Sequence, residues 1–503
     1  MEVMKHKVCL EPIHKELEVV HNTPLRDVLI DWGVEFPCGG RGFCGNCKVR
    51  ILSGNIEMSD SHVALLNKKR LNTDWRLACL SRITEDVTIY VEQFQYIIQT
   101  DQTPFPIEPE EGDGIAVDVG STTLVAQLMD LRNGKIKSVA TSLNPQRQYG
   151  ADIISRISYA LASGEQASRL SWLSRDAIGD LIRELLPGHG HNVRKIVLVG
   201  NSVMHHLFCA LDVRPLSVYP FQSPANDMQI LRSDSLHWPL GTDCSIRFFP
   251  NMSHFVGSDI LAGIEAVQMH KQDCFQVLMD LGTNGEIVVG NKERIMCTST
   301  AAGPAFEGIN ISQGMKAATG AIYQVTENCQ VKVIGNVSPV GICGSGLIDA
   351  IDLFLKQSYI DGSGAVRDGG KYLPLCETVG LTDKDIREFQ LAKSAIRTGL
   401  EILLTEMELS LDDIEHVYIT GGLGSYLDID KAIHVGLLDD KMRTKVVKLN
   451  NAALLGARMF LFDSTEQDWK SILQKSHYCT LESHPCFQDL FCSHLFFPMD
   501  GDD

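Results

Sequence analysis

Hydrophobic and polar residues alternate in short runs through the first hundred residues, and stretches with helical periodicity separate these runs. Alternation with a period of two predicts strands, whereas apolar residues three and four apart predict helices. The expected elements are two strands within residues 6–20, a helix in 23–33, a strand in 48–52, a helix in 61–71 and a strand in 87–94. This order predicts a small mixed β-grasp domain over residues 1–98.

Three cysteines and four glycines lie within residues 37–48, in the loop between the first predicted helix and the next strand. Cys38, Cys44 and Cys47 have the spacing C-x5-C-x2-C, and Cys79 follows far downstream. This spacing is close to the C-x4-C-x2-C…C pattern by which four thiolates hold a [2Fe–2S] cluster. Glycines in such a loop accept positive φ and let backbone N–H groups point at the anionic sulfurs.

Two other interpretations of these cysteines compete with the cluster. A structural zinc site usually draws on paired C-x2-4-C knuckles, whereas this segment offers one pair and two single cysteines. Cysteines that are merely buried would not need the surrounding glycines. We therefore predict that Cys38, Cys44, Cys47 and Cys79 are the cluster ligands, and that Cys9 is a core residue.

From residue 114 onward the pattern contains an internal repeat. An apolar strand that turns at D-x-G-(S/T)-(T/N) recurs, followed in the same order by a buried strand that ends in glycine and by a helix rich in small residues. The matching segments are 115–123 with 277–284, 195–201 with 417–422, and 257–263 with 451–457. These pairs predict a duplicated α/β domain whose halves are residues 114–273 and 274–463.

The two D-x-G turns are predicted to bind the phosphates of a nucleotide between the two halves. Backbone N–H groups and short hydroxyls would surround the phosphate oxygens from both sides. The residues that provide them are Gly120, Ser121, Thr122, Thr123, Gly282, Thr283 and Asn284. Asp118 and Asp280 are placed to hold Mg²⁺ through water or to orient an attacking water. A purely structural turn is the alternative, because aspartate and glycine end many strands.

A general base for hydrolysis has two candidates after the second turn, Glu286 and Glu307. A solvated carboxylate is the simpler interpretation of each, and we place Glu286 with Asp118 and Asp280 as the candidate catalytic residues. The chain contains no G-x-x-x-x-G-K-(S/T) sequence and no G-x-G-x-x-G after a strand. P-loop and Rossmann nucleotide sites are therefore disfavoured.

Two further segments connect or close these domains. Residues 99–113 carry three prolines and five acidic residues and predict a linker. This linker either lets the first domain swing or packs as a strap on the second domain. Residues 464–503 contain Cys479, Cys486 and Cys492 with three histidines, but their apolar pattern predicts a segment that packs back on the second domain rather than a metal site.

Composition limits the partners and the location. Lysine and arginine number 45 against 63 acidic residues, and the net charge of −18 disfavours nucleic acid or an anionic membrane as a partner. The 15 cysteines are too few in 503 residues for a disulfide scaffold. The N-terminus has no apolar signal region, and no run approaches the length of a membrane span. These features predict a cytoplasmic protein.

The first domain resembles plant- or adrenodoxin-type ferredoxins over its whole length. Residues 114–463 resemble the actin, sugar-kinase and Hsp70-type ATPases, which share a ribonuclease H-like fold. The resemblance implies a first phosphate loop at 118–123, a second at 280–286, an adenosine loop with Gly421, Gly422 and Gly424, and hinge helices near 257–263 and 451–457. The fold class is therefore predicted as α/β multidomain, a β-grasp ferredoxin domain joined to a duplicated actin-like ATPase domain.

This pair of domains resembles the reductive activators of corrinoid proteins. The resemblance implies an enzyme that uses ATP to drive one electron from the cluster into cob(II)alamin on a corrinoid methyl carrier, giving cob(I)alamin. The implied cofactors are the [2Fe–2S] cluster, ATP and Mg²⁺. The implied partners are a corrinoid protein of a methyltransferase system, an upstream electron donor and a second copy of the chain. Members of the family carry an additional domain between linker and ATPase, whereas here the linker runs almost straight into Ile115.

Two other functions are compatible with the same residues. A small-molecule kinase of the actin-like fold with a redox-regulatory ferredoxin domain would show ADP release that its substrate stimulates. An electron-carrying adaptor would bind nucleotide without turning it over.

Overall fold

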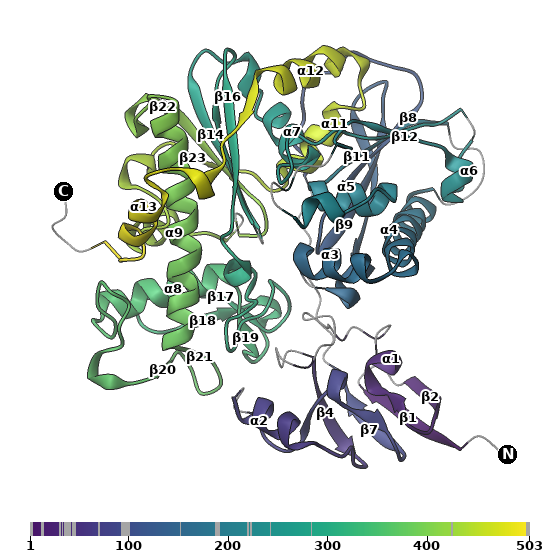
Figure 1. Cartoon of the computed structure of the whole chain (residues 1–503), viewed down its shortest axis with the longest axis vertical. Helices are drawn as coiled ribbons and strands as arrows, with labels where there is room; N and C mark the ends of the chain where they lie inside the picture. The colour runs from purple at the N-terminus through teal and green to yellow at the C-terminus, as the bar shows by residue number, and fades with distance from the viewer. Residues whose placement is uncertain are drawn as a thin grey trace. The chain divides into compact units, whose positions relative to one another are not determined.

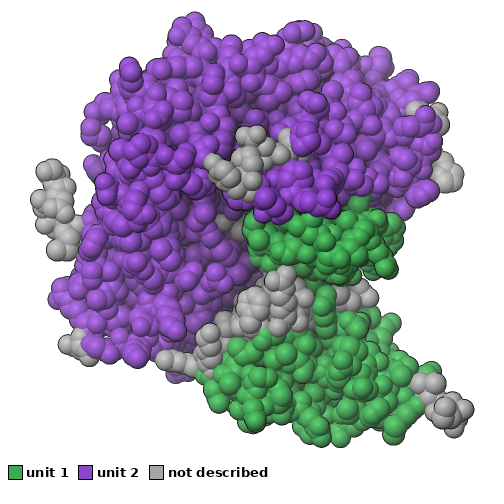
Figure 2. Space-filling model, viewed as in Figure 1, with its two compact units in different colours: residues 1–95, 144–174 green, residues 96–143, 175–503 purple. Residues whose placement is uncertain are grey.

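The structure, a computed structural model, describes residues 4–11, 15–29, 32, 34, 42, 47–68, 71–91, 101–150, 152–186, 192–218, 221, 224–241, 243–282, 284–423 and 426–498. The chain forms two compact units, residues 1–95 with 144–174 and residues 96–143 with 175–503 (Figure 2). Figure 1 labels most of the helices and strands named below. None of the described helices is both long enough and apolar enough to cross a membrane.

The first unit contains a five-stranded mixed sheet with the order β2-β1-β7-β4-β5. Its elements are β1 (Lys5–Glu11), β2 (Lys15–Val20), α1 (Leu25–Leu29), β4 (Lys48–Ser53), α2 (Asp60–Lys68), β5 (Trp75–Leu77) and β7 (Val87–Tyr90), with the short pair β3 (Thr23–Pro24) and β6 (Arg82–Ile83). Strands β1 and β7 are parallel, and the other neighbours in this sheet are antiparallel. Val8 and Leu10 are buried with Leu25 and Leu29, because alternate residues of a strand share one face. The predicted β-grasp domain is confirmed.

The same unit also includes a helical segment. It contains the 3-10 helix η3 (Pro145–Tyr149), α3 (Ile153–Ala162) and the first part of α4 (Gly164–Leu185). Asp152 caps α3, since its side chain accepts a hydrogen bond from the Ser155 N–H.

The second unit contains two six-stranded sheets that share the order of five strands and carry the sixth at opposite edges. The first is β10-β9-β8-β11-β13-β12, and the second is β24-β16-β15-β14-β22-β23. The strands of the first are β8 (Asp113–Val119), β9 (Thr123–Asp130), β10 (Lys135–Leu143), β11 (Val193–Val199), β12 (Gln229–Leu231) and β13 (Ser245–Phe248). Those of the second are β14 (Phe275–Leu281), β15 (Gly285–Gly290), β16 (Ile295–Thr300), β22 (Ile414–Thr420), β23 (Val446–Lys448) and β24 (Ser476–Tyr478).

The five strands β10-β9-β8-β11-β13 correspond to β16-β15-β14-β22-β23, with the same parallel and antiparallel pairings. The helices that close the two halves, α7 (Ser258–Ala266) and α11 (Ala452–Met459), pack against each other. A Cβ on Gly456 would lie 1.9 Å from the Ala262 carbonyl oxygen, so only glycine lets these two backbones approach so closely. The predicted duplication and the pairing of its small-residue helices are confirmed.

The remaining strands form a three-stranded sheet, β18-β17-β19, and a pair, β20-β21, and further helices complete the second unit. These elements are α5 (Ser202–Cys209), α6 (Ser233–Leu236), β17 (Ala321–Val325), β18 (Val331–Val333), β19 (Gly341–Ile342), α8 (Gly344–Lys356), β20 (Tyr372–Pro374), β21 (Gly380–Thr382), α9 (Asp383–Glu406), α10 (Ile429–His434), α12 (Glu466–Lys475) and α13 (Phe487–Ser493). Helix α9 packs on β15 and β16, and α13 packs on α9.

Residues 101–113 lie along the second unit as a packed strap. Asp101 is buried, and its Oδ1 accepts a hydrogen bond from the Arg458 guanidinium of α11 at 2.5 Å. Its carbonyl oxygen accepts a hydrogen bond from Gln127 Nε2 at 2.7 Å, and the ring of Phe105 meets that of Phe462 edge-on. Of the two alternatives for the linker, packing is the one found at these residues, while residues 99 and 100 lie outside the described part of the chain.

Candidate functional site

The predicted cluster site brings Cys47 and Cys79 together. Cys47 directly precedes β4, and Cys79 lies in the 3-10 helix η2 (Ala78–Leu80) that follows β5. Their sulfur atoms lie 3.1 Å apart, and the backbone N–H of Cys79 donates a hydrogen bond to the Cys47 sulfur at 3.4 Å. The Ala78 N–H donates to the Cys47 carbonyl oxygen at 2.8 Å, which fixes the two cysteines relative to each other. Cys38 and Cys44 lie outside the described residues.

Gly42 is the described glycine of this cysteine loop, and its surroundings show why a side chain is excluded there. Its φ is +77°, and a Cβ would lie 2.6 Å from the side chain of Leu80, the residue after Cys79. Gly42 therefore lies directly against the turn that carries Cys79. Two adjacent thiols close to a glycine with positive φ fit a [2Fe–2S] cluster, which takes four cysteine thiolates as ligands.

Two buried side chains hold the strand that leads to Cys79. The Arg76 guanidinium donates to the Ile56 carbonyl oxygen at 2.5 Å and to the Thr73 carbonyl oxygen at 2.6 Å. His62 Nε2 accepts a hydrogen bond from the Leu77 N–H at 2.8 Å, and burial lowers the pKa of this imidazole, which favours its neutral form. Sequence reasoning missed both residues, because the bonds from Arg76 to Ile56 and from Leu77 to His62 join positions 20 and 15 residues apart.

Four carboxylates of the second unit gather where the two halves meet. Asp118 and Asp280 occupy the same position near the ends of β8 and β14, and Glu286 lies on β15 opposite Asp280 in the antiparallel register. Asp259 lies in the first turn of α7. All four side chains belong to partly exposed residues, so the group remains accessible to solvent and ligand.

The four carboxylates lie close enough together to raise one another's pKa. Burial, opposed by the hydrogen bond from Asn451, raises the pKa of Asp118 to about 6. Burial and the charge of Asp118 raise the pKa of Asp280 to about 7. Burial and the charges of Asp280 and Asp118 raise the pKa of Asp259 to about 8. Burial and the charges of Asp259 and Asp280 raise the pKa of Glu286 well above its usual value. A bound divalent cation would reverse these shifts.

Residues of the second half of the duplication surround both aspartates and the first turn. Asn451, which caps α11, donates to Asp118 Oδ2 at 2.9 Å. Gly421 has φ +88°, and a Cβ there would lie 2.4 Å from Asp280 Oδ1, so this glycine makes room for the carboxylate. Lys316 Nζ lies 3.5 Å from Thr122 Oγ1, which brings a positive charge to the first turn.

The other predicted nucleotide contacts form the two turns. Gly120, Ser121 and Thr122 connect β8 to β9, and Gly282 and Asn284 connect β14 to β15, where the Gly282 N–H donates to the Asn284 carbonyl oxygen at 3.2 Å. Thr123 is the first residue of β9, and Gly422 follows Gly421. Thr283 and Gly424 lie outside the described residues.

Sequence reasoning missed Asp259, Lys316 and Asn451. Asp259 and Asn451 both lie at the starts of the repeated helices, so their place in the duplication was a signal that could have identified them. Lys316 carried no such signal, because it lies in a loop far from Thr122 in the sequence.

Two histidines of the C-terminal segment pair with carboxylates of α9. His484 Nε2 pairs with Glu406 at 3.1 Å, and His494 Nε2 pairs with Glu401 at 2.7 Å. Both contacts join α13 and its flanking residues to α9. Among the described residues, these histidines belong to no group of three side chains that could hold a metal ion.

Three protein families match consecutive parts of this chain. A 2Fe-2S iron-sulfur cluster binding domain matches residues 10–84, the RACo middle region matches 113–272, and the C-terminal domain of RACo, described as the ASKHA domain, matches 275–503. The chain thus joins an iron–sulfur cluster binding domain to a nucleotide-binding domain of the ASKHA class. It belongs to the RACo family. The RACo middle region matches the first half of the duplication, so the expectation that this chain lacks a domain between linker and ATPase is wrong.

Individual relatives agree with this assignment. The corrinoid activation enzyme RamQ of Eubacterium limosum is 31% identical, over 76% of this chain and 70% of its own. The Co(II) methylated amine-specific corrinoid protein reductase of Methanosarcina barkeri is 26% identical over 71% of each chain. A solved reductive activator for corrinoid, iron-sulfur protein is 26% identical with a TM-score of 0.69, and the match covers 98% of this chain and 99% of the other.

Proposed function

We propose that this protein uses ATP to transfer one electron to the cob(II)alamin of a corrinoid protein and so restores cob(I)alamin. The observation that carries the proposal is that one chain joins a cysteine site for a [2Fe–2S] cluster to a site of four carboxylates at two facing D-x-G turns. Its similarity to corrinoid activators extends over both parts of the chain.

The cluster would supply a single electron at low potential. Cys47 and Cys79 would be two of its ligands, with Cys38 and Cys44 from the glycine-rich loop as the others. Plant-type clusters have reduction potentials of about −400 mV. The potential of the cob(II)/cob(I) couple is lower, so the transfer is uphill. A shortfall of roughly 100 mV corresponds to only about 2.3 kcal/mol for one electron, which one cycle of ATP hydrolysis exceeds.

The nucleotide site would provide this energy. Backbone N–H groups and hydroxyls of the two turns, together with Lys316, would bind the phosphates. Asp118 and Asp280 would hold Mg²⁺ through water. Among the described residues, neither belongs to a group of three side chains close enough to bind one ion directly. Glu286 would orient the attacking water, and Asp259 lies close enough to influence its charge.

Coupling would run through the contact between α7 and α11. Asp259 begins α7 and Asn451 caps α11, so each of these packed helices carries a residue of the carboxylate site at its start. Closure around a nucleotide would change the angle between the halves. Different affinities of the two conformations for the two corrinoid redox states would then drive the transfer. An upstream electron donor would reload the cluster after each turnover. The protein would act as a homodimer, which light scattering would test.

Anaerobic absorption spectroscopy tests the proposal. Reduced protein is mixed with a cob(II) corrinoid carrier, with and without Mg-ATP. Growth of the cob(I) band only with ATP is expected. Equal growth without nucleotide, or none in either sample while ATP is consumed, would refute the proposed role of ATP.

A further inference from the structure

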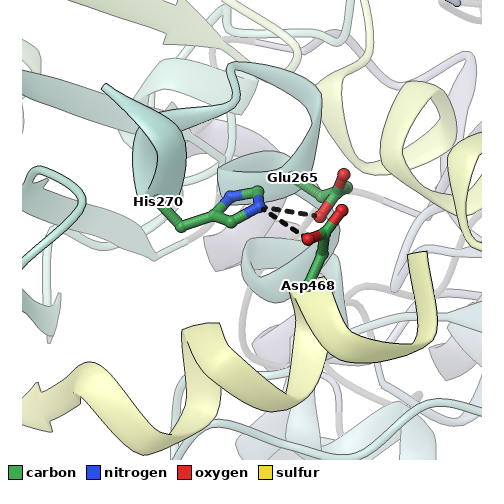
Figure 3. A group of neighbouring side chains, drawn as sticks. All are labelled: Glu265, His270 and Asp468. Atoms are coloured by element: carbon green, nitrogen blue, oxygen red, sulfur yellow. Dashed lines mark ion pairs between the residues drawn. The ribbon is translucent and has the colours of Figure 1, made fainter. Parts of the chain in front are cut away.

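Glu265, His270 and Asp468 form a group of potential metal ligands separate from the carboxylate site (Figure 3). Glu265 lies near the end of α7, His270 in the following 3-10 helix η5 (Met269–Lys271), and Asp468 in the first turn of α12. One ligand atom of each lies within 4.8 Å of the others, and it is the one such group among the described residues. In Figure 3 the imidazole points toward both carboxylates.

Burial and spacing distinguish this group from an ordinary ion pair. The side chains of Glu265 and His270 are 0% and 3% exposed. His270 Nε2 lies 3.6 Å from Glu265 Oε2 and 3.7 Å from Asp468 Oδ1, which is too long for a hydrogen bond to either. Glu265 Oε2 and both ring nitrogens of His270 have no hydrogen-bond partner in the described part of the chain. Such buried, unpaired polar atoms are costly unless something binds them.

Neighbouring side chains leave one oxygen of each carboxylate facing the imidazole. Gln268 Nε2 donates to Glu265 Oε1 at 2.8 Å, so Oε2 is the oxygen that faces His270. Lys271 Nζ lies 2.6 Å from Asp468 Oδ2, so Oδ1 faces His270.

We propose that Glu265 Oε2, His270 Nε2 and Asp468 Oδ1 bind one divalent transition-metal ion that clamps α12 to α7. Two bonds of about 2.0–2.2 Å to such an ion place their ligand atoms roughly 3.3–3.7 Å apart. His270 Nε2 lies 3.6 and 3.7 Å from the two carboxylate oxygens. One imidazole with two carboxylates suits Zn²⁺ or Mn²⁺, whereas Mg²⁺ and Ca²⁺ prefer oxygen ligands alone. Asp468 is 23% exposed, which leaves a side open for water and for entry of the ion.

The proposal is independent of the proposed electron transfer, because the ion would fix the C-terminal segment and take no part in redox chemistry. The test uses the full chain with its cluster loaded, so that the cluster cysteines do not compete for zinc. Bound zinc is counted by mass spectrometry after gel filtration, and affinity is measured by competition with a fluorescent zinc chelator. The variants are Asp468→Asn, His270→Gln and, as a matched control, Asp273→Asn, which removes a surface carboxylate that also pairs with a lysine.

We expect one zinc per chain in the wild type and in D273N, and a rise in Tm with zinc in both. Zinc affinity should fall at least ~10-fold in D468N and H270Q. Even the loss of a residue that only hydrogen-bonds to a metal ligand costs about 10–100-fold in metal affinity. D468N is the variant less prone to misfold, because the Asp468 side chain is 23% exposed whereas that of His270 is 3% exposed. Absence of bound zinc in the wild type would overturn the proposal. So would a zinc affinity in D468N and H270Q that equals the wild-type affinity. So would a zinc-edge anomalous diffraction peak located only elsewhere.

Discussion

The two halves of the duplicated domain share their strand order but differ in their carboxylates. In the first hairpin Asp118 lies opposite Val125, whereas in the second Asp280 lies opposite Glu286. The repeated helices differ in the same way, since Asp259 of α7 corresponds to Ala453 of α11. Each half thus adds one carboxylate that the other lacks. The duplication supplies a symmetric pair of aspartates, and the positions where the copies diverged supply the asymmetry that the proposed hydrolysis would use.

The largest effect should come from the carboxylate that only the second hairpin carries. Glu286→Gln removes the group that would orient water, so we expect kcat for ATP hydrolysis to fall about 10²–10⁴-fold while Mg-ATP affinity is retained. Glu293→Gln, on the exposed turn after the same hairpin, is the control and should leave kcat within about twofold. Full activity in E286Q would show that the asymmetry between the hairpins has no catalytic meaning.

The symmetric pair can be separated by comparing Asp280→Asn with Asp118→Asn. Asp280 influences the charge of both Asp259 and Glu286, whereas Asp118 influences Asp280 and Asp259 and is held by Asn451. We expect D280N to weaken Mg²⁺-dependent ATP binding by about 10–100-fold and D118N by less, as measured by calorimetry. A larger loss in D118N would reverse this ranking of the two halves.

Gly421 and Gly422 provide a matched test of the room made for Asp280. A Cβ on Gly421 would collide with Asp280 Oδ1, whereas a Cβ on Gly422 would meet nothing within 4 Å. Gly421→Ala should lower the free energy of unfolding by about 1–3 kcal/mol and weaken nucleotide binding. Gly422→Ala should change stability by no more than about 0.5 kcal/mol. Equal results for both variants in chemical denaturation would contradict the close approach.

The raised carboxyl pKa values predict a pH dependence of the nucleotide-free protein. The folded state holds protons that the unfolded state releases near pH 4, so stability is lost as pH rises through the folded pKa values of about 6 to 8. Between pH 5 and 8 the Tm should therefore fall, and in Asp259→Asn it should fall by roughly 2–4 °C less. The exposed control Asp273→Asn should follow the wild type. A Tm that rises over this interval would contradict the repulsion among the four groups.

Local signals in the sequence predicted much of the fold, and they identified the cysteine loop and the two D-x-G turns as candidate sites. The alternation in the first domain, the cysteine spacing and the repeated D-x-G strands all lie within short windows, and these windows specify their own strands and turns. The register of the second hairpin even places Glu286 opposite Asp280, as alternation implies.

The contacts that complete the site could not be predicted in this way, because they join residues far apart in the chain. Lys316 reaches Thr122 across 194 positions, and Asn451 reaches Asp118 across 333. The strap was equally ambiguous, since its acidic, proline-rich composition suits a free linker. Its packing depends on Arg458, which lies 357 residues from Asp101.

The coupling of ATP turnover to electron transfer is tested most directly by the E286Q protein in a single-turnover experiment. Reduced E286Q with its cluster loaded is saturated with Mg-ATP and mixed anaerobically with the cob(II) carrier, beside the wild type. We expect E286Q to retain ATP unhydrolysed and to form no more cob(I) than the nucleotide-free sample, while the wild type forms the full band. Full cob(I) formation by E286Q without hydrolysis would contradict the account, because binding alone would then drive the electron.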